Sequence, residues 1–133
     1  MKDLNDIILP EDVGFTDEHV WLRIEGEEAL VGISDFAQDQ LGEIAFVDLP
    51  AEGAHFGAGD EFGTVESLKS VNPLYMPVAG TILAANEELE AIPTLVNVSP
   101  YEKGWMLRIK PDSTADAATL ADSAAYRALL QKN

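Results

Sequence analysis

The fold is decided by residues 61–85, which read EFGTVESLKSVNPLYMPVAGTILAA. Residues 61–66 and 74–76 are predicted strands, and the stretch between them predicts the tip of a hairpin. A proline and a glycine then separate the second strand from another predicted strand at 80–85. Short strands punctuated by glycine and proline are typical of a small sandwich or barrel and not of parallel βαβ units.

The other predicted elements lie on both sides of this segment. Ser34 is a good helix N-cap and Gly42 suits a helix end, so residues 34–42 predict a short helix. Elsewhere we expect strands at 20–24, 29–33, 43–49 and 104–110, a loop at 51–59, irregular structure at 94–98, and short terminal helices at 115–120 and 122–131. The expected fold class is therefore mainly β with short helices.

Composition excludes several classes of function. The chain has 133 residues, the size of one ordinary domain, so we expect a single domain over residues 1–133 with a short helical segment at about 115–131. Acids number 24 and bases 8, and the resulting net charge of −16 repels nucleic acids and anionic lipid surfaces. Cysteine is absent, which removes disulfides, thiolate nucleophiles, iron–sulfur clusters and cysteine-ligated zinc.

The remaining residue types give no sign of catalysis or metal binding. The two histidines, His19 and His55, are too far apart in sequence to indicate a metal site. With 24 acids, a pair of carboxylates is no indication of acid–base chemistry, and no activated nucleophile stands out. Trp21 and Trp105 lie at strand positions where tryptophan usually packs a core. We expect no catalytic residue, no metal ligand and, because we find no targeting or membrane segment, a cytoplasmic protein.

Lys69 is the residue that gives the clearest indication of a function. Between residues 3 and 102 there are 21 acids but only two cations, Arg23 and Lys69. Lys69 lies at the predicted hairpin tip, where the flanking strands would hold it in an exposed, fixed position for a lysine-modifying enzyme. A lone turn lysine is by itself most often only solvated, so this pattern leaves both interpretations open.

The segment around Lys69 resembles a known family. Residues 63–70, GTVESLKS, and residues 75–80, YMPVAG, are similar to the lipoyl-attachment motif of the glycine cleavage system H-protein family. Further blocks agree in order and spacing over roughly residues 13–130: FTDEHVW at 15–21, VGISDFAQDQLGEI at 31–44, LVN at 95–97 and PYEKGW at 100–105.

The resemblance implies a fold and a role. The fold would be a lipoyl/biotinyl-type barrel-sandwich hybrid of two packed antiparallel sheets with short appended helices. Lys69 would carry a covalent lipoate, and Glu66 would help the lipoylating enzyme to recognise the site. Such a protein is a carrier and not an enzyme. In the family, the arm takes an aminomethyl group from glycine decarboxylase to an aminomethyltransferase, and dihydrolipoamide dehydrogenase reoxidises the dithiol.

Departures from the usual family pattern cluster near the expected arm and open alternatives. Residues 70–73 read SVNP where an acid is usual, Val20 replaces a glutamate, and residues 76–81 read MPVAGT in place of SPVSGE. H-like lipoate-binding proteins of sulfur oxidation share the fold and the lysine, and their arm would carry sulfur intermediates for a heterodisulfide-reductase-like complex. A lipoate reservoir or relay is a third interpretation. Glycine cleavage is preferred because it is the commonest setting of this motif.

Overall fold

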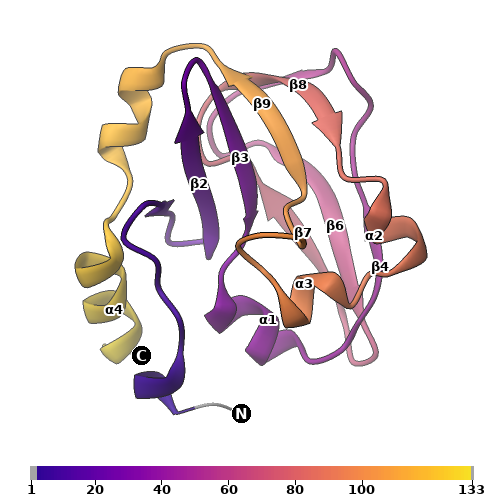
Figure 1. Ribbon diagram of the computed structural model, residues 1–133, viewed down its shortest axis with the longest axis vertical. Coiled ribbons are helices and arrows are strands. Elements are labelled where there is room, and N and C mark those ends of the chain that lie inside the picture. The colour runs from indigo at the N-terminus through magenta and orange to yellow at the C-terminus, as the bar shows by residue number, and fades with distance from the viewer. Residues whose placement is uncertain (1–2, 133) are drawn as a thin grey trace.

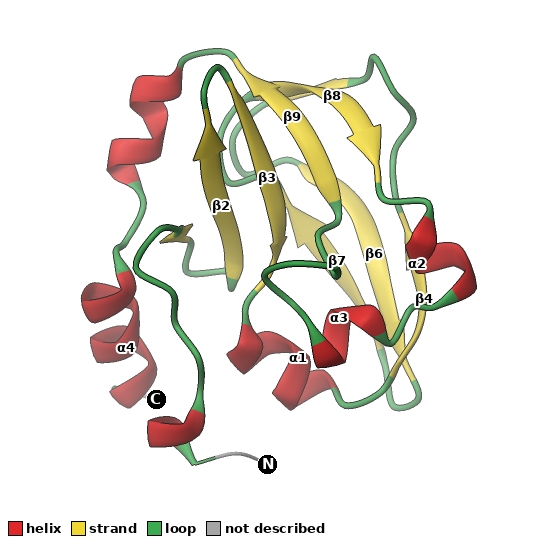
Figure 2. Ribbon diagram, in the orientation of Figure 1, coloured by secondary structure: helices red, strands yellow, loops and turns green. Residues whose placement is uncertain are grey.

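In the computed structural model, which describes residues 3–132, nine strands form two antiparallel sheets (Figures 1 and 2). The larger sheet has the strand order β1-β2-β3-β9-β8-β5 and the smaller one β4-β6-β7. The strands are β1 Gly14–Phe15, β2 Val20–Glu25, β3 Glu28–Ile33, β4 Ile44–Asp48, β5 His55–Phe56, β6 Glu61–Ser67, β7 Val71–Tyr75, β8 Gly80–Ala85 and β9 Leu107–Pro111. The helices are α1 Asp35–Leu41, α2 Glu88–Ala91, α3 Leu95–Val98, α4 Ser123–Gln131 and the 3₁₀ turns Leu4–Asp6 and Thr114–Thr119. This architecture confirms the expected mainly β fold class.

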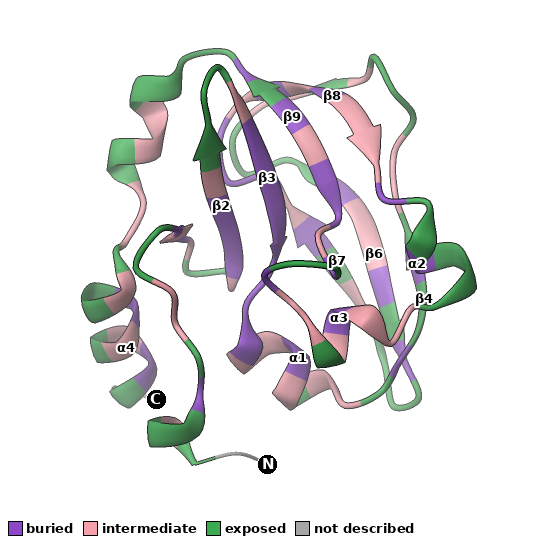
Figure 3. Cartoon of the chain, viewed as in Figure 1, coloured by how far each residue is buried: buried purple, intermediate pink, exposed green. Residues whose placement is uncertain are grey.

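The main hydrophobic core fills the space between the two sheets (Figure 3). Val31 and Ile109 of the larger sheet and Val65 of the smaller one are almost completely buried in it. A second cluster, which includes Phe15, Trp21 and Tyr126, lies between the larger sheet and α4. Strands β2 and β3 therefore carry apolar side chains toward both clusters, and this part of the sheet is buried on both faces.

Trp21 occupies the second cluster because its strand neighbour has no side chain. Trp21 pairs with Gly32 across β2 and β3. A Cβ atom on Gly32 would lie 2.8 Å from three indole atoms of Trp21, so the indole lies directly across this glycine. Trp105 packs against the same cluster. The expectation that both tryptophans pack the core is confirmed.

Helix α1 forms as the sequence predicts. The Ser34 hydroxyl accepts a hydrogen bond from the backbone N–H of Ala37 at 3.1 Å, which caps the N-terminus. At the other end Gly42 takes a positive φ of +80°, a conformation that disfavours side chains with a Cβ.

Two predicted segments near the hairpin differ from the structure. The expected loop at 51–59 contains β5, in which His55 pairs with Thr81 of β8. The returning strand of the hairpin begins at Val71, earlier than the predicted 74–76, although it contains Pro73. A proline is tolerated there because β7 is an edge strand. It pairs with a neighbouring strand on one side only, so a proline without an N–H on the other side breaks no hydrogen bond of the sheet.

Two later segments also differ. Residues 94–98, expected to be irregular, form α3 after the short α2. The strand expected at 104–110 begins only at Leu107, and the carbonyls of Lys103 and Trp105 before it accept hydrogen bonds from the Asn86 amide at 2.9 and 2.8 Å. The predicted terminal helices are found as the second 3₁₀ turn and α4. Within the described residues, no helix has the length and apolarity needed to span a membrane.

Candidate functional site: a lysine at a hairpin tip

Strands β6 and β7 form a hairpin whose tip presents Lys69. The strands pair up to Glu66 and Val71, and residues 68–70 are exposed. Ser67 closes the tip: its N–H donates to the Ser70 carbonyl at 2.8 Å, and its hydroxyl accepts from the N–H groups of Lys69 and Ser70, both at 3.2 Å. The backbone on both sides of Lys69 is therefore held by local hydrogen bonds.

Strand β4 supports the tip from the other side. Ile44 pairs with Ser67, and the Leu68 N–H donates to the Glu43 carbonyl at 3.2 Å. The Lys69 side chain lies against Gly42, where a Cβ atom would be 3.3 Å from its Cε and 3.6 Å from its Nζ. A glycine at the end of α1 thus leaves room for the lysine stem beside the tip.

Asn97 links the elements that hold the tip, and sequence reasoning did not assign it this role. Its amide nitrogen donates to the Gly42 carbonyl at 2.8 Å and to the Gln38 side-chain oxygen at 3.0 Å. Its oxygen accepts from the Ile44 N–H at 2.9 Å. One side chain therefore joins the end of α1 to the start of β4. The signals for it in the sequence were an asparagine among apolar residues and its place in the LVN block at 95–97.

Lys69 and Glu66, the two predicted site residues, lie on the same hairpin. Both side chains are exposed, and within residues 3–132 neither has an oppositely charged partner within 4.0 Å. Glu66 pairs across the sheet with Phe46 on one side and Val71 on the other. The amine of Lys69 is thus free of an ion pair to a carboxylate and accessible to a modifying enzyme.

A groove of about 430 Å³ lies beside the hairpin between α1 and β7. Its lining includes the polar side chains of Glu18, His19, Gln40, Asn72 and Tyr75, together with apolar residues of α1 and β7. A larger recess of about 530 Å³ lies elsewhere, between the end of β4 and α2. We consider the groove to be part of the site because it is built on the hairpin that carries Lys69.

His19 has an unusual conformation in the wall of this groove. Its φ is +68°, and its Nδ1 shares a 2.6 Å hydrogen bond with the Tyr126 hydroxyl, which in turn lies 2.9 Å from the Ser34 hydroxyl. Burial lowers the pKa of His19 below 6.5, its ordinary value, although Glu18 and Asp17 oppose this shift. Helix α4 thus reaches the groove through Tyr126 and fixes the imidazole.

We expect the stabilising contribution of His19 to shrink on acidification. Because its pKa is lowered by folding, the unfolded chain takes up this proton first, so the contribution is present above pH 6.5 and is lost as pH falls toward the folded-state pKa. The measurement is urea unfolding of the wild type and His19→Gln at about pH 7.5 and about pH 5.5. His55→Gln controls for the loss of an imidazole. A stability difference for His19→Gln that does not shrink at the lower pH contradicts the prediction.

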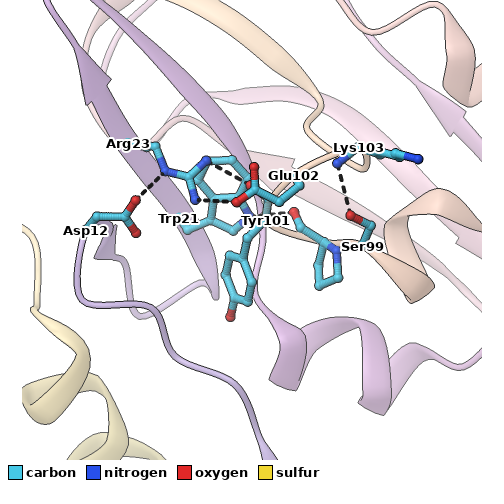
Figure 4. Close-up of polar contacts among 8 residues, drawn as sticks. Asp12, Trp21, Arg23, Ser99, Tyr101, Glu102 and Lys103 are labelled. Atoms are coloured by element: carbon cyan, nitrogen blue, oxygen red, sulfur yellow. Dashed lines mark hydrogen bonds and ion pairs between the residues drawn. The ribbon is translucent and has the colours of Figure 1, made fainter.

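Arg23 and its neighbours Trp21 and Asp12, which we call the arginine cluster, hold the segment that follows α3 (Figure 4). The Arg23 guanidinium lies 5.2 Å from the centre of the Trp21 ring, donates to the Tyr101 carbonyl at 2.8 Å and pairs with Asp12 at 3.0 Å. The Trp21 indole N–H donates to the Pro100 carbonyl at 3.0 Å. This cluster connects β2 to residues 99–105, and so fixes the chain just beyond Asn97.

The fold and this site define a small β protein that presents one lysine on a closed hairpin. A family model described as "Glycine cleavage H-protein" matches residues 13–133. Proteins named glycine cleavage system H protein are 47% identical to this chain in Bacteroides fragilis, over 91% of the chain and 96% of that protein, and 51% identical in Salinibacter ruber, over 88% and 94%. The chain belongs to the glycine cleavage H-protein family, whose members are lipoyl carriers.

A solved structure agrees with this assignment. The crystal structure of a glycine cleavage system H protein from Mycobacterium marinum superposes with a TM-score of 0.85 at 29% identity, over 92% of this chain and 99% of that one. The family resemblance predicted from the sequence blocks is therefore confirmed.

Proposed function

We propose that this protein is the lipoyl carrier of a glycine cleavage system, with lipoate attached to Lys69. The observation that carries the proposal is the exposed amine of Lys69 at the tip of a hairpin whose backbone is closed by Ser67 and anchored to β4. Family membership supports the same assignment. In this function the arm shuttles an aminomethyl group between enzymes, and the chain itself catalyses no step.

The residues present fit a covalently attached arm. Lys69 Nζ has no ion pair to break within the described part of the chain, and Gly42 leaves space beside the lysine stem. The rigid tip fixes where the arm begins, while the flexible lysine stem lets its far end move. When bound, the lipoyl group supplies a disulfide to a chain that has no cysteine.

The partners follow from this function. A lipoylating enzyme would act on the protein first. Glycine decarboxylase, aminomethyltransferase and dihydrolipoamide dehydrogenase would then bind and act on the lipoyl arm one after another. A net charge of −16 favours encounter with basic docking faces. The relatives described above carry the glycine cleavage name, and no observation on this chain favours sulfur oxidation.

Intact mass measurement tests the proposal in two stages. Protein made in a lipoylating host should exceed the sequence mass by one lipoyl amide, mapped to Lys69. Incubation with glycine and a pyridoxal-phosphate glycine decarboxylase should then add one aminomethyl group. Lipoylation without this second increment, while a known H protein is loaded in the same tube, would contradict a role in glycine cleavage.

We expect Glu66→Gln to weaken recognition by the lipoylating enzyme. The exposed carboxylate lies three residues before Lys69 and has no charged partner within residues 3–132, so it is available for a charge-assisted hydrogen bond to the enzyme. Losing one such bond should raise the KM for the unmodified protein about tenfold. Glu61→Gln, at the exposed far end of the same strand, is the matched control. Equal KM values for the two variants would remove Glu66 from the recognition site.

A further inference from the structure

The outer face of the β4-β6-β7 sheet carries apolar side chains next to the lysine. Phe46 of β4, Glu66 of β6 and Val71 of β7 are paired in one row across the three strands. Phe46 is 52% exposed, Val71 60% and Leu68, at the tip, 73%. We call these four residues, Phe46, Glu66, Leu68 and Val71, the hairpin face.

Folding does not account for the apolar character of this face. The opposite face of the same sheet supplies Val47 and Val65 to the main core, whereas the side chains of the hairpin face lie outside it. Three of the seven large hydrophobic side chains exposed within residues 3–132 belong to this small area. Apolar side chains that gather at one exposed place are typical of an interaction surface.

The charged side chains around the hairpin face indicate which kind of partner surface can bind it. Glu66 lies in the middle of the row, Glu43 is exposed at the base of the tip, and Asp48 is exposed two residues beyond Phe46 on β4. Lys69, in the turn between β6 and β7, is the one lysine or arginine between residues 43 and 75. A second copy of the chain would bring carboxylates against carboxylates, which is unfavourable. The complementary surface is an apolar recess with arginine or lysine at its edge.

We propose that the hairpin face is the surface by which the lipoylating enzyme binds this protein. The proposal rests on the function proposed above, because it needs Lys69 to be the acceptor. An enzyme that encloses the end of the lysine side chain must also cover its neighbours on the hairpin, and these are Leu68 and Val71. Phe46, 23 residues before Lys69 in sequence, extends the same surface onto β4. The enzyme would therefore contact the paired strands of the sheet and not only the motif around the lysine.

Kinetics of lipoylation test this surface. An ATP-dependent lipoate–protein ligase joins the lipoate carboxyl carbon to Lys69 Nζ and releases AMP and diphosphate, and intact mass follows the product. We expect Phe46→Ser and Val71→Ser each to raise the KM for the unmodified protein about tenfold, with kcat within about twofold of wild type. Added salt should raise the wild-type KM, because the edge contacts are ionic.

Ile24→Ser is the matched control. Ile24 is 39% exposed at the end of β2, and Figure 1 places the β2–β3 turn at the opposite end of the molecule from the β6–β7 tip. The KM of the ligase for unmodified Ile24→Ser should equal its KM for the wild-type protein. Urea unfolding midpoints identify any variant that is substantially unfolded, and Phe46→Thr then replaces Phe46→Ser.

The outcomes separate the two proposals. A folded Phe46 variant with wild-type KM, or one that loses only kcat, overturns the docking surface while leaving Lys69 as the acceptor. Wild-type protein that is not lipoylated at all overturns the proposed function itself. Light scattering that shows a wild-type dimer, and a monomer for Phe46→Ser, assigns the face to a second copy and also overturns the proposal.

Discussion

Replacing Lys69 by arginine is expected to give a folded protein with no lipoyl group and no activity in a reconstituted glycine cleavage system. The guanidinium keeps the positive charge but stays protonated, so it cannot attack an activated carboxyl group. Lys69 is exposed and outside both hydrophobic clusters, so the fold does not depend on it. Intact mass after expression with a lipoylating enzyme should equal the sequence mass of the variant.

Lys103→Arg is the control for this experiment. Lys103 is also exposed, but it lies in the segment held by the arginine cluster, where its backbone N–H donates to the Ser99 hydroxyl at 3.0 Å (Figure 4). This variant should be lipoylated as completely as wild type. A lipoyl group on the Lys69→Arg protein, or activity equal to that of Lys103→Arg, would show that Lys69 is not the acceptor.

Local sequence signals predicted the hairpin and the helix beside it. Residues 61–66 have the composition of a short strand and are followed by a predicted turn, and Ser34 and Gly42 are helix-end residues, so each element could be recognised from a few neighbouring positions. The exposed position of Lys69 followed directly from the hairpin. The early start of β7 was missed because Pro73 argues against a strand unless that strand is known to be an edge.

Contacts between distant residues could not be predicted in the same way. Asn97 holds Gly42 and Ile44 across more than 50 residues, and Tyr126 reaches His19 across 107. The row of Phe46, Glu66 and Val71 likewise depends on strand register, which a shift of one residue would reverse. These features needed the three-dimensional pairing of the strands, and they are the ones that shape the surroundings of Lys69.

Gly63→Ala is expected to destabilise the sheet that carries the hairpin. A Cβ atom at this position would overlap the carbonyl oxygen of Asp48 and lie 3.3 Å from its carbonyl carbon, and both atoms belong to the backbone of β4. Because a backbone cannot rotate away as a side chain can, β4 and β6 must separate locally. We expect the free energy of unfolding to fall by about 3 kcal/mol, measured by urea denaturation.

Gly57→Ala is the matched control, since its Cβ atom would meet only the flexible Asp60 carboxylate, at 3.2 Å. It should cost much less stability, and equal losses for the two variants would contradict the explanation from backbone overlap.

Gly63→Ala should also be lipoylated poorly even where it remains folded. Separation of β4 from β6 displaces Phe46 relative to Glu66 and weakens the bond from Leu68 to Glu43 that anchors the tip. Stability and presentation of the lysine are thus coupled through this one glycine.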